Sequence, residues 1–482
     1  MTVLFISISF LIASYFIYGR YVERIFQVRD EQMTPAYLQR DEVDFVPLSK
    51  AKNGLIQLLN IAGMGPIYGP ILGAIWGPVS LLWILLGAVF AGAVHDYFIG
   101  MISVRHRGAH LPEITREFFG HKGKAVMALF ILSLLLLVGT MFVRSPVTLI
   151  DGITPSWLTS THILCAIFAY YFLSTILPIH QIIGKLYPLL GFFFFSCTLW
   201  IAFCLFRQPE KLSQISWFSL PSPSLPLFPS LFLTISCGAL SGFHATQSPL
   251  LSRTLRRESD GKCVFYGMMI AEACIAFIWG VATLALIDHE HLVQILTGGS
   301  GGPEAVVTQI ANQLIGPWGR SMAIGAIAIL PLTSGDTAFR CARIILGDSL
   351  NISQKPVLSR LLLALPLFGG AIFLLHSHSF FHLWSYFSLS NQLVASFSLW
   401  ISTLYLRRER RSYWITTIPA FFITTVCLTH ILRDPAFALS LSQFLSLLFS
   451  LLLTSLLSLL LLRNPTSQLP SQRGLRASTQ FK

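Results

Sequence analysis

Apolar residues form about thirteen long stretches along the chain, separated by short polar segments. An α-helix needs roughly 20 residues, within a range of about 17–25, to cross the hydrocarbon core of a bilayer. The stretches match that length, so the pattern predicts an all-α, polytopic membrane protein. The predicted spans are 2–18, 52–75, 79–104, 124–144, 162–179, 185–206, 228–247, 262–288, 317–347, 357–376, 380–406, 412–431 and 437–463.

Positive charge gives these spans an orientation. All but five of the 33 Lys and Arg residues lie in every second loop or in the C-terminal tail. The five exceptions are Arg144, Arg207, Lys211, Arg320 and Arg433. Cytoplasmic loops are enriched in Lys and Arg, whereas Asp and Glu matter little. The alternation therefore predicts an outer N-terminus, a cytoplasmic C-terminus and an odd number of spans.

Composition agrees with a membrane setting. With 54% hydrophobic and 11% charged residues, the chain has too little charge to cover a soluble particle. The net charge of +12 does not call for nucleic acid, because basic loops facing anionic lipid headgroups account for it. The eight Cys residues lack CxxC spacing, so no metal site or disulfide framework is expected. Met1–Gly19 lacks a basic N-terminal region, which favours a retained helix over a cleaved signal peptide.

The expected organisation follows the spans. An N-terminal helix and cytoplasmic loop precede two larger units, two further helices and a disordered cytoplasmic tail. The boundaries are 1–51, 52–227 (ending in an outer crossover loop), 228–406, 407–463 and 464–482. A short interfacial helix is also expected at 304–314 in the outer loop before the ninth span.

Two spans contain too many helix breakers to be plain helices. The first break is expected at 62–70 and the second at 241–249. Pro lacks an N–H and crowds the preceding turn, while Gly tolerates unusual dihedral angles. Non-helical backbone at membrane depth occurs only inside protein or beside water, because lipid cannot satisfy its polar groups. For either segment alone, a kinked or closely packed GxxxG-type helix is the favoured interpretation.

The positions of the two breaks carry more information than either break alone. They lie in spans 2 and 7, which run in opposite directions through the membrane. Paired Gly/Pro-interrupted segments at matching positions of two halves indicate a transporter built from inverted repeats, with its binding site at the breaks. We therefore expect two five-helix repeats, a 5+5 core. The candidate substrate-binding residues are Gly63, Gly65, Pro66, Tyr68, Ser241, Gly242, His244 and Thr246.

Three acidic residues lie well inside predicted spans, where charge is costly and usually marks an ion or substrate pathway. Glu272 is expected near mid-depth, and Asp96 and Asp336 in the cytoplasmic half. The alternative for each is a structural ion pair, which Asp336 could form with Arg340 or Arg343. Glu272 has no basic residue at helical spacing, so it is the favoured proton-coupling residue.

Hydroxyl and imidazole groups complete the candidate set. Thr333 and Ser334, with carbonyls of the first break, could ligate Na⁺, although hydroxyls often bond back to their own helix. His244 could relay protons or bind a carboxylate, and the alternative is a hydrogen bond that packs helices together. The sequence contains no nucleophile–base or zinc-hydrolase motif, so no enzymatic activity, metal or cofactor is expected beyond a coupling ion, H⁺ or Na⁺.

Several motifs resemble the carbon starvation protein A (CstA) family. They are Asp41–Pro47, Gly63–Pro70, Gly92–Tyr97, Ser241–Ala245, Glu272 and Asp336–Arg340. They occur in the family's order over roughly residues 15–350. Glu42 stands where Gly is common, and His95 where Gln is common.

The resemblance implies a secondary transporter of the inner membrane with a LeuT-type core. Its expected activity is uptake of pyruvate or short peptides coupled to H⁺. A membrane nutrient sensor that does not transport is the alternative, but it would usually carry a soluble signalling domain, and no polar segment here is long enough for one.

Overall fold

The computed structural model describes residues 2–41, 44–176, 179–217, 226–297, 301–377, 380–435 and 439–463. In these ranges the backbone is helical or irregular, with no β-strand. Glu42 and the tail 464–482, expected to be disordered, lie outside the described residues. The helices are α1 Thr2–Phe26, α2 Pro35–Leu38, α3 Lys50–Ala62, α4 Gly65–Gly73, α5 Val79–Gly87, α6 Ala93–Arg105, α7 Leu111–Asp151, α8 Ser160–Ile176, α9 Ile179–Phe206, α10 Pro209–Ser213, α11 Ser230–Thr234, α12 His244–Ser252, α13 Met268–Leu286, α14 His289–Thr297, α15 Gly302–Leu350, α16 Val357–Ser377, α17 Phe380–Arg408, α18 Trp414–Arg433 and α19 Gln443–Arg463.

The fold is an all-helical bundle of a multi-pass membrane protein. Among the described residues, eight helices are long and apolar enough to cross a membrane, or nine if the bent pair α3–α4 is one span. Helices also form at the other predicted spans, α8, α15 and α17 among them. The total of thirteen remains a prediction.

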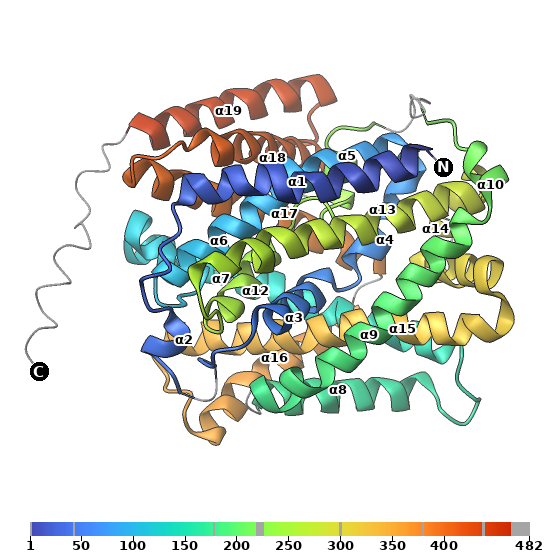
Figure 1. Ribbon diagram of the computed structural model, residues 1–482, viewed down its shortest axis with the longest axis horizontal. Helices are drawn as coiled ribbons and strands as arrows, with labels where there is room; N and C mark the ends of the chain where they lie inside the picture. Colours follow the sequence, from blue (N-terminus) through green and yellow to red (C-terminus); the bar gives the residue numbers. More distant parts are fainter. Residues whose placement is uncertain are drawn as a thin grey trace, which may run out of the picture.

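Most of the long helices run roughly along the longest axis of the molecule (Figure 1). The helices α18 and α19 pack together along one edge, and α8 and α16 along the opposite edge (Figure 1). Between these edges, α3, α4, α12 and α13 are buried in the interior. The bundle thus surrounds its interrupted helices with continuous ones.

The first break is shorter than expected. Only Gly63 and Met64 separate α3 from α4, and the two helical segments meet at a bend of 43°. Gly63 has φ 48°, a left-handed conformation that side chains disfavour. Pro66 sits in the first turn of α4, where its missing N–H costs nothing, so the expected break over 62–70 is too long.

The second break lies earlier than expected. The chain leaves α11 at Thr234 and starts α12 at His244, so the irregular backbone covers 235–243 rather than 241–249. Gly238, with φ 84°, provides the left-handed turn. Pro249 lies inside α12 and does not interrupt it. The prediction placed too much weight on Pro249 and too little on Gly238.

Two long helices each contain one glycine with a non-helical backbone conformation. In α15 the non-helical residue is Gly316, which divides the predicted short helix at 304–314 from the predicted span 317–347. In α7 it is Gly120, just before the predicted span 124–144. The turn at Gly316 lies between the two predicted segments of that region. The helix before Gly120, which begins at Leu111, was instead predicted as part of the loop 105–123.

Candidate functional site

The first break exposes a backbone carbonyl that a second helix satisfies. The Leu59 carbonyl lies in the last turn of α3, beside the first break, where helix carbonyls need partners from outside the helix. The Ser334 hydroxyl donates to the Leu59 oxygen at 2.9 Å, and the Thr333 hydroxyl lies 3.1 Å from the same oxygen. The Thr333 hydroxyl also lies 2.9 Å from the Leu330 carbonyl of its own helix, which is the alternative expected from the sequence. The structure thus brings both predicted hydroxyls to a carbonyl of the first break, and all three oxygens are of the type that a hard cation such as Na⁺ prefers.

The two breaks are in contact. A Cβ added to Gly65, at the start of α4, would lie 2.1 Å from the Cβ and 2.3 Å from the Sγ of Cys237 in the second break. Phe142 of α7 covers Gly63, and its ring meets that of Phe243 edge-on at 5.8 Å. Only glycine at position 65 allows this approach, so the two interruptions predicted from separate halves of the chain form one junction.

Polar side chains of α17 support the backbone of the second break. Asn391 Oδ1 accepts the N–H of Phe243 at 2.6 Å and the hydroxyl of Ser241 at 3.2 Å. Gln392 Nε2 donates to the Leu240 carbonyl at 3.0 Å. Gly242 packs so closely on α17 that a Cβ would lie 2.1 Å from the carbonyl oxygen of Asn391. These contacts supply the partners that lipid could not give to irregular backbone.

Ionisable side chains from three helices converge beside this break. His244 Nδ1, on α12, lies 2.8 Å from Asp96 Oδ2 on α6. His244 Nε2 lies 3.4 Å from Glu272 Oε2 on α13. All three side chains are fully buried. The structure therefore joins two residues predicted for ion coupling to one predicted for substrate binding.

Further hydrogen bonds hold the side chains of Asp96 and Glu272 in place. Glu272 Oε1 accepts the N–H of Gly238 at 3.1 Å. His95 Nδ1 lies 2.8 Å from Asp96 Oδ1, and His95 Nε2 lies 2.6 Å from the Ser398 hydroxyl of α17. A π-helical turn at Ala88–Gly92 comes just before Asp96, and such turns often occur at functional sites. The charged groups thus have defined orientations.

Three side chains at the junction have the chemistry of metal ligands. A ligand atom from each of Cys237, His244 and Glu272 lies within 4.8 Å of the others, and all three residues are buried. Spacing alone indicated no metal site. The fold assembles this cluster from separate segments, which local motifs do not reveal.

The other predicted site residues have hydrogen-bond partners outside the Asp96, His244 and Glu272 group. The Tyr68 hydroxyl lies 2.6 Å from that of Ser145 on α7. Thr246 donates to the Phe243 carbonyl of its own helix turn at 2.6 Å. Asp336 accepts from Tyr170 and Ser174 of α8 at 2.8 and 3.0 Å. Two of the partners of Asp336 are therefore on α8.

Sequence reasoning missed a polar face on α3. Asn53, Gln57 and Asn60 are fully buried and follow helical spacing along one side. Gln57 Nε2 lies 3.4 Å from the Ser248 hydroxyl of α12, and Asn53 bonds to Thr254 just beyond that helix. Both amide atoms of Asn60 lack a hydrogen-bond partner among the described residues. The signal that could have revealed this polar face is the helical spacing of three side-chain amides within an otherwise apolar span.

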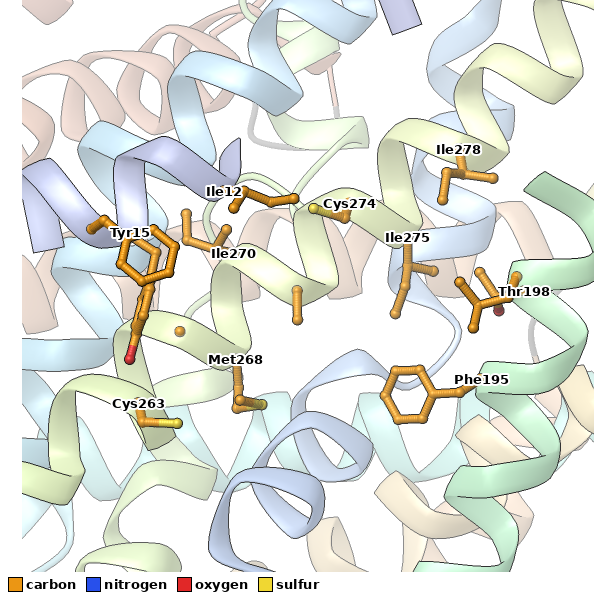
Figure 2. Close-up of a pocket in the computed structure, with 14 residues that line it drawn as sticks. Ile12, Tyr15, Phe195, Thr198, Cys263, Met268, Ile270, Cys274, Ile275 and Ile278 are labelled. Atoms are coloured by element: carbon orange, nitrogen blue, oxygen red, sulfur yellow. The ribbon is translucent and has the colours of Figure 1, made fainter. Parts of the chain in front are cut away.

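A separate groove of about 470 Å³ opens on the outside of the bundle, between α1, α9 and α13. Figure 2 shows Ile12, Ile275 and Phe195 among its lining residues. Its walls are almost wholly apolar, which suits a lipid chain better than a water-soluble solute.

The family model described as "Carbon starvation protein CstA" matches residues 1–156, 152–300 and 293–430. The chain belongs to the CstA family. An uncharacterized membrane protein of Haemophilus influenzae is 42% identical over 344 residues, covering 60% of this chain and 92% of that protein.

Two relatives in the family have functional names. The peptide transporter CstA of Campylobacter jejuni is 25% identical over 550 aligned positions, covering 88% of this chain and 78% of that protein. The pyruvate/proton symporter BtsT of Escherichia coli is 28% identical over 341 positions, covering 57% and 48%.

The fold also occurs in solved transporter structures. MhsT in complex with L-phenylalanine matches with a TM-score of 0.56 at 14% identity, covering 86% of this chain and 98% of that one. At this identity the likeness establishes the LeuT-type fold alone. The CstA-family chain thus has a transporter fold with an interrupted, ionisable centre.

Proposed function

We propose that this protein is a secondary active transporter of the inner membrane that takes up a small organic carboxylate, pyruvate or a short peptide, together with H⁺. The observation that carries the proposal is the buried Asp96–His244–Glu272 chain at the contact between the two broken helices. Ionisable groups are costly inside a membrane and usually mark an ion or substrate pathway, and binding of a transported proton would give these groups such a role.

The broken helices suit a substrate with a carboxylate. Both α4 and α12 begin at a break, and the N-terminus of a helix carries partial positive charge. Asn60 adds a buried amide without a partner in the described part of the chain, and such a group is costly unless a ligand or water bonds to it. We assign the substrate site to Gly63, Gly65 and Pro66 of the first break, with Asn60 beside them. Tyr68, Ser241, Gly242, His244 and Thr246 complete the proposed site.

The proposed architecture has thirteen spans with an outer N-terminus and a cytoplasmic C-terminus. Two inverted five-helix repeats, 52–227 and 228–406, would each contribute one break. The additional helices 1–51 and 407–463 would flank this core. The contact between the breaks and the LeuT-type fold support this division.

Sodium is the alternative coupling ion. Thr333, Ser334 and the Leu59 carbonyl offer three oxygens at the first break. Asp96, Glu272 and Asp336 are the proposed carboxyl groups for proton coupling, with Glu272 first because it lies at the second break. The two schemes place the driving ion at opposite breaks.

Uptake of radiolabelled solute into proteoliposomes tests the function. We expect accumulation of pyruvate or a dipeptide when the outside is acidic, and none from a Na⁺ gradient alone. Accumulation driven only by Na⁺ would indicate that the coupling ion is Na⁺ and that it binds at the first break. Failure of both solutes under both gradients would contradict the proposed transport.

Two buried asparagines of α3 make a matched pair for the substrate site. Asn60→Ala should raise the substrate concentration for half-maximal uptake about tenfold, equivalent to about 1.4 kcal/mol, with little loss of stability. Asn53, by contrast, bonds through both amide atoms to Thr254. Asn53→Ala should therefore lower thermal stability and leave that concentration unchanged. If both variants change the substrate concentration for half-maximal uptake equally, Asn60 is not part of the substrate site.

A further inference from the structure

The cluster of Cys237, His244 and Glu272 contains two buried atoms without a hydrogen bond. His244 Nε2 and Glu272 Oε2 face each other at 3.4 Å, yet within the described ranges neither has a hydrogen-bond partner. A buried nitrogen and a buried carboxylate oxygen left in this state are costly. The two atoms form an ion pair with each other, and a partner that bonds to both would offset the remaining cost.

The separation of these two atoms fits a shared metal ion. Zinc binds imidazole nitrogen and carboxylate oxygen at about 2.0–2.2 Å, and two ligands of a tetrahedral site at that radius are about 3.3–3.6 Å apart. The observed 3.4 Å between His244 Nε2 and Glu272 Oε2 falls in this range. The third ligand atom, from Cys237, lies within 4.8 Å of the other two. Small side-chain rotations would bring it to bonding distance.

The surroundings orient the two non-sulfur ligands. Asp96 Oδ2 lies 2.8 Å from His244 Nδ1, so a proton on Nδ1 leaves the lone pair of Nε2 directed to the cluster. The Gly238 N–H bonds to Glu272 Oε1 at 3.1 Å and leaves Oε2 available. A carboxylate behind a ligating histidine is the common support of zinc sites.

We propose that Cys237, His244 and Glu272 bind a transition-metal ion of the zinc class, and that the bound ion blocks transport. Thiolate and imidazole ligands favour Zn²⁺ over Mg²⁺ or Ca²⁺, which prefer oxygen. Three protein ligands leave a fourth position for water, as in zinc sites with an open coordination position.

Blocking follows from where the ligands lie. Cys237 is in the second break, His244 begins α12, and Glu272 is on α13. An ion bonded to all three ties the break to α13, and Cys237 also packs against Gly65 of the first break. Metal binding stands on this geometry alone, whereas inhibition of uptake rests on the proposed transport function.

The binding test uses the purified full-length protein and Zn²⁺ alone. We expect about one Zn²⁺ per chain, measured by equilibrium dialysis with elemental analysis. Cys237→Ser should weaken binding at least about tenfold, and Asp96→Asn by about 10–100-fold through loss of support for His244.

Cys274 is the matched control because it lies two residues after Glu272 on the same helix. Its side chain lines the external apolar groove (Figure 2), and it is not one of the three clustered residues. Cys274→Ser should bind Zn²⁺ like the unaltered protein. Absence of Zn²⁺ binding, or equal binding by Cys237→Ser and the unaltered protein, would overturn the site.

The transport test measures the fraction of each variant's own uptake that remains with micromolar Zn²⁺. The unaltered protein and Cys274→Ser should be inhibited, and Cys237→Ser should be at least about tenfold less sensitive. Equal sensitivity of Cys237→Ser would contradict inhibition through this site. If neither the unaltered protein nor any variant transports either solute, the proposed transport function is contradicted. Equilibrium dialysis then still tests the metal site by itself.

Discussion

At both breaks, backbone polar groups need partners from other helices, but the two breaks have partners of different chemistry. The first spans only Gly63 and Met64, and the Leu59 carbonyl beside it lies next to the neutral hydroxyls of Thr333 and Ser334. The second spans 235–243, and its partners include Asn391 and the carboxylate of Glu272. A break with neutral partners can change its contacts at little electrostatic cost, whereas a break with carboxylate partners is sensitive to protons and cations.

This difference suggests a division of roles. Both breaks supply helix N-termini for a substrate, but only the second lies beside the Asp96–His244–Glu272 chain. Proton coupling therefore belongs to the second break in our account. The first break would respond to a cation only through hydroxyl and carbonyl oxygens.

The largest expected effect comes from forcing the breaks apart. Gly65→Ala adds a Cβ that would lie 2.1 Å from that of Cys237, which cannot be relieved by rotation of a flexible side chain. We expect a destabilisation of about 3 kcal/mol and loss of uptake. Thermal unfolding in detergent and uptake in proteoliposomes measure these effects.

A second substitution shows whether the clash is the cause. Cys237→Gly removes the side chain in question, so the double variant Gly65→Ala/Cys237→Gly should recover part of the lost stability. If the double variant is less stable than Gly65→Ala alone, the two breaks are not in the contact described.

Removal of the main support of the second break should have the next largest effect. Asn391→Ala leaves the buried N–H of Phe243 without its acceptor, at a cost of about 2 kcal/mol. Asn391→Asp keeps an acceptor oxygen and should cost less. The melting temperatures of both variants test this order, and equal losses would show that the acceptor is unimportant.

Single changes at the first break should be milder. Thr333→Val leaves Ser334 to satisfy the Leu59 carbonyl, so it should cost about 1 kcal/mol, and the same holds for Ser334→Ala. The double variant leaves the carbonyl without either donor, and its loss of stability should exceed the sum of the two single losses.

The same variants test the coupling ion. With H⁺ as the driving ion, each single variant should still accumulate solute. Selective loss of Na⁺-dependent uptake would instead place ion coupling at the first break.

A substitution remote from both breaks should have the smallest effect. Leu459 of α19 is 55% exposed on the outer edge of the bundle. Leu459→Ala should change stability by no more than about 0.5 kcal/mol and leave uptake unchanged. A large loss of uptake would mean that α19 takes part in the transport cycle.

The interrupted helices could be predicted from the sequence because Gly and Pro act locally. The glycine turn at Gly63 is a property of a few adjacent residues. The position of the second break was wrong because Pro249 is compatible with a helix, whereas Gly238, in an apolar stretch, adopts the left-handed conformation.

The long-range pairings could not be predicted in the same way. Asp96 and Glu272 were recognised as costly acids, but nothing in their spacing indicates that His244 lies between them. Asp336 was grouped with them on the same argument, and nothing in its spacing indicates the hydrogen bonds that it accepts from Tyr170 and Ser174 of α8. Asn391 and Cys237 were missed because each gains its role only from the residues that the fold brings to it.

The most direct test of the account separates exchange from accumulation in Glu272→Gln. Glutamine keeps an oxygen that can accept the Gly238 N–H, so the second break should retain its structure while losing a proton-binding group. The variant should exchange labelled for unlabelled solute across the proteoliposome membrane like the unaltered protein, yet fail to concentrate it under an acid-outside gradient. If Glu272→Gln still concentrates solute with the same pH dependence, coupling does not reside at the second break.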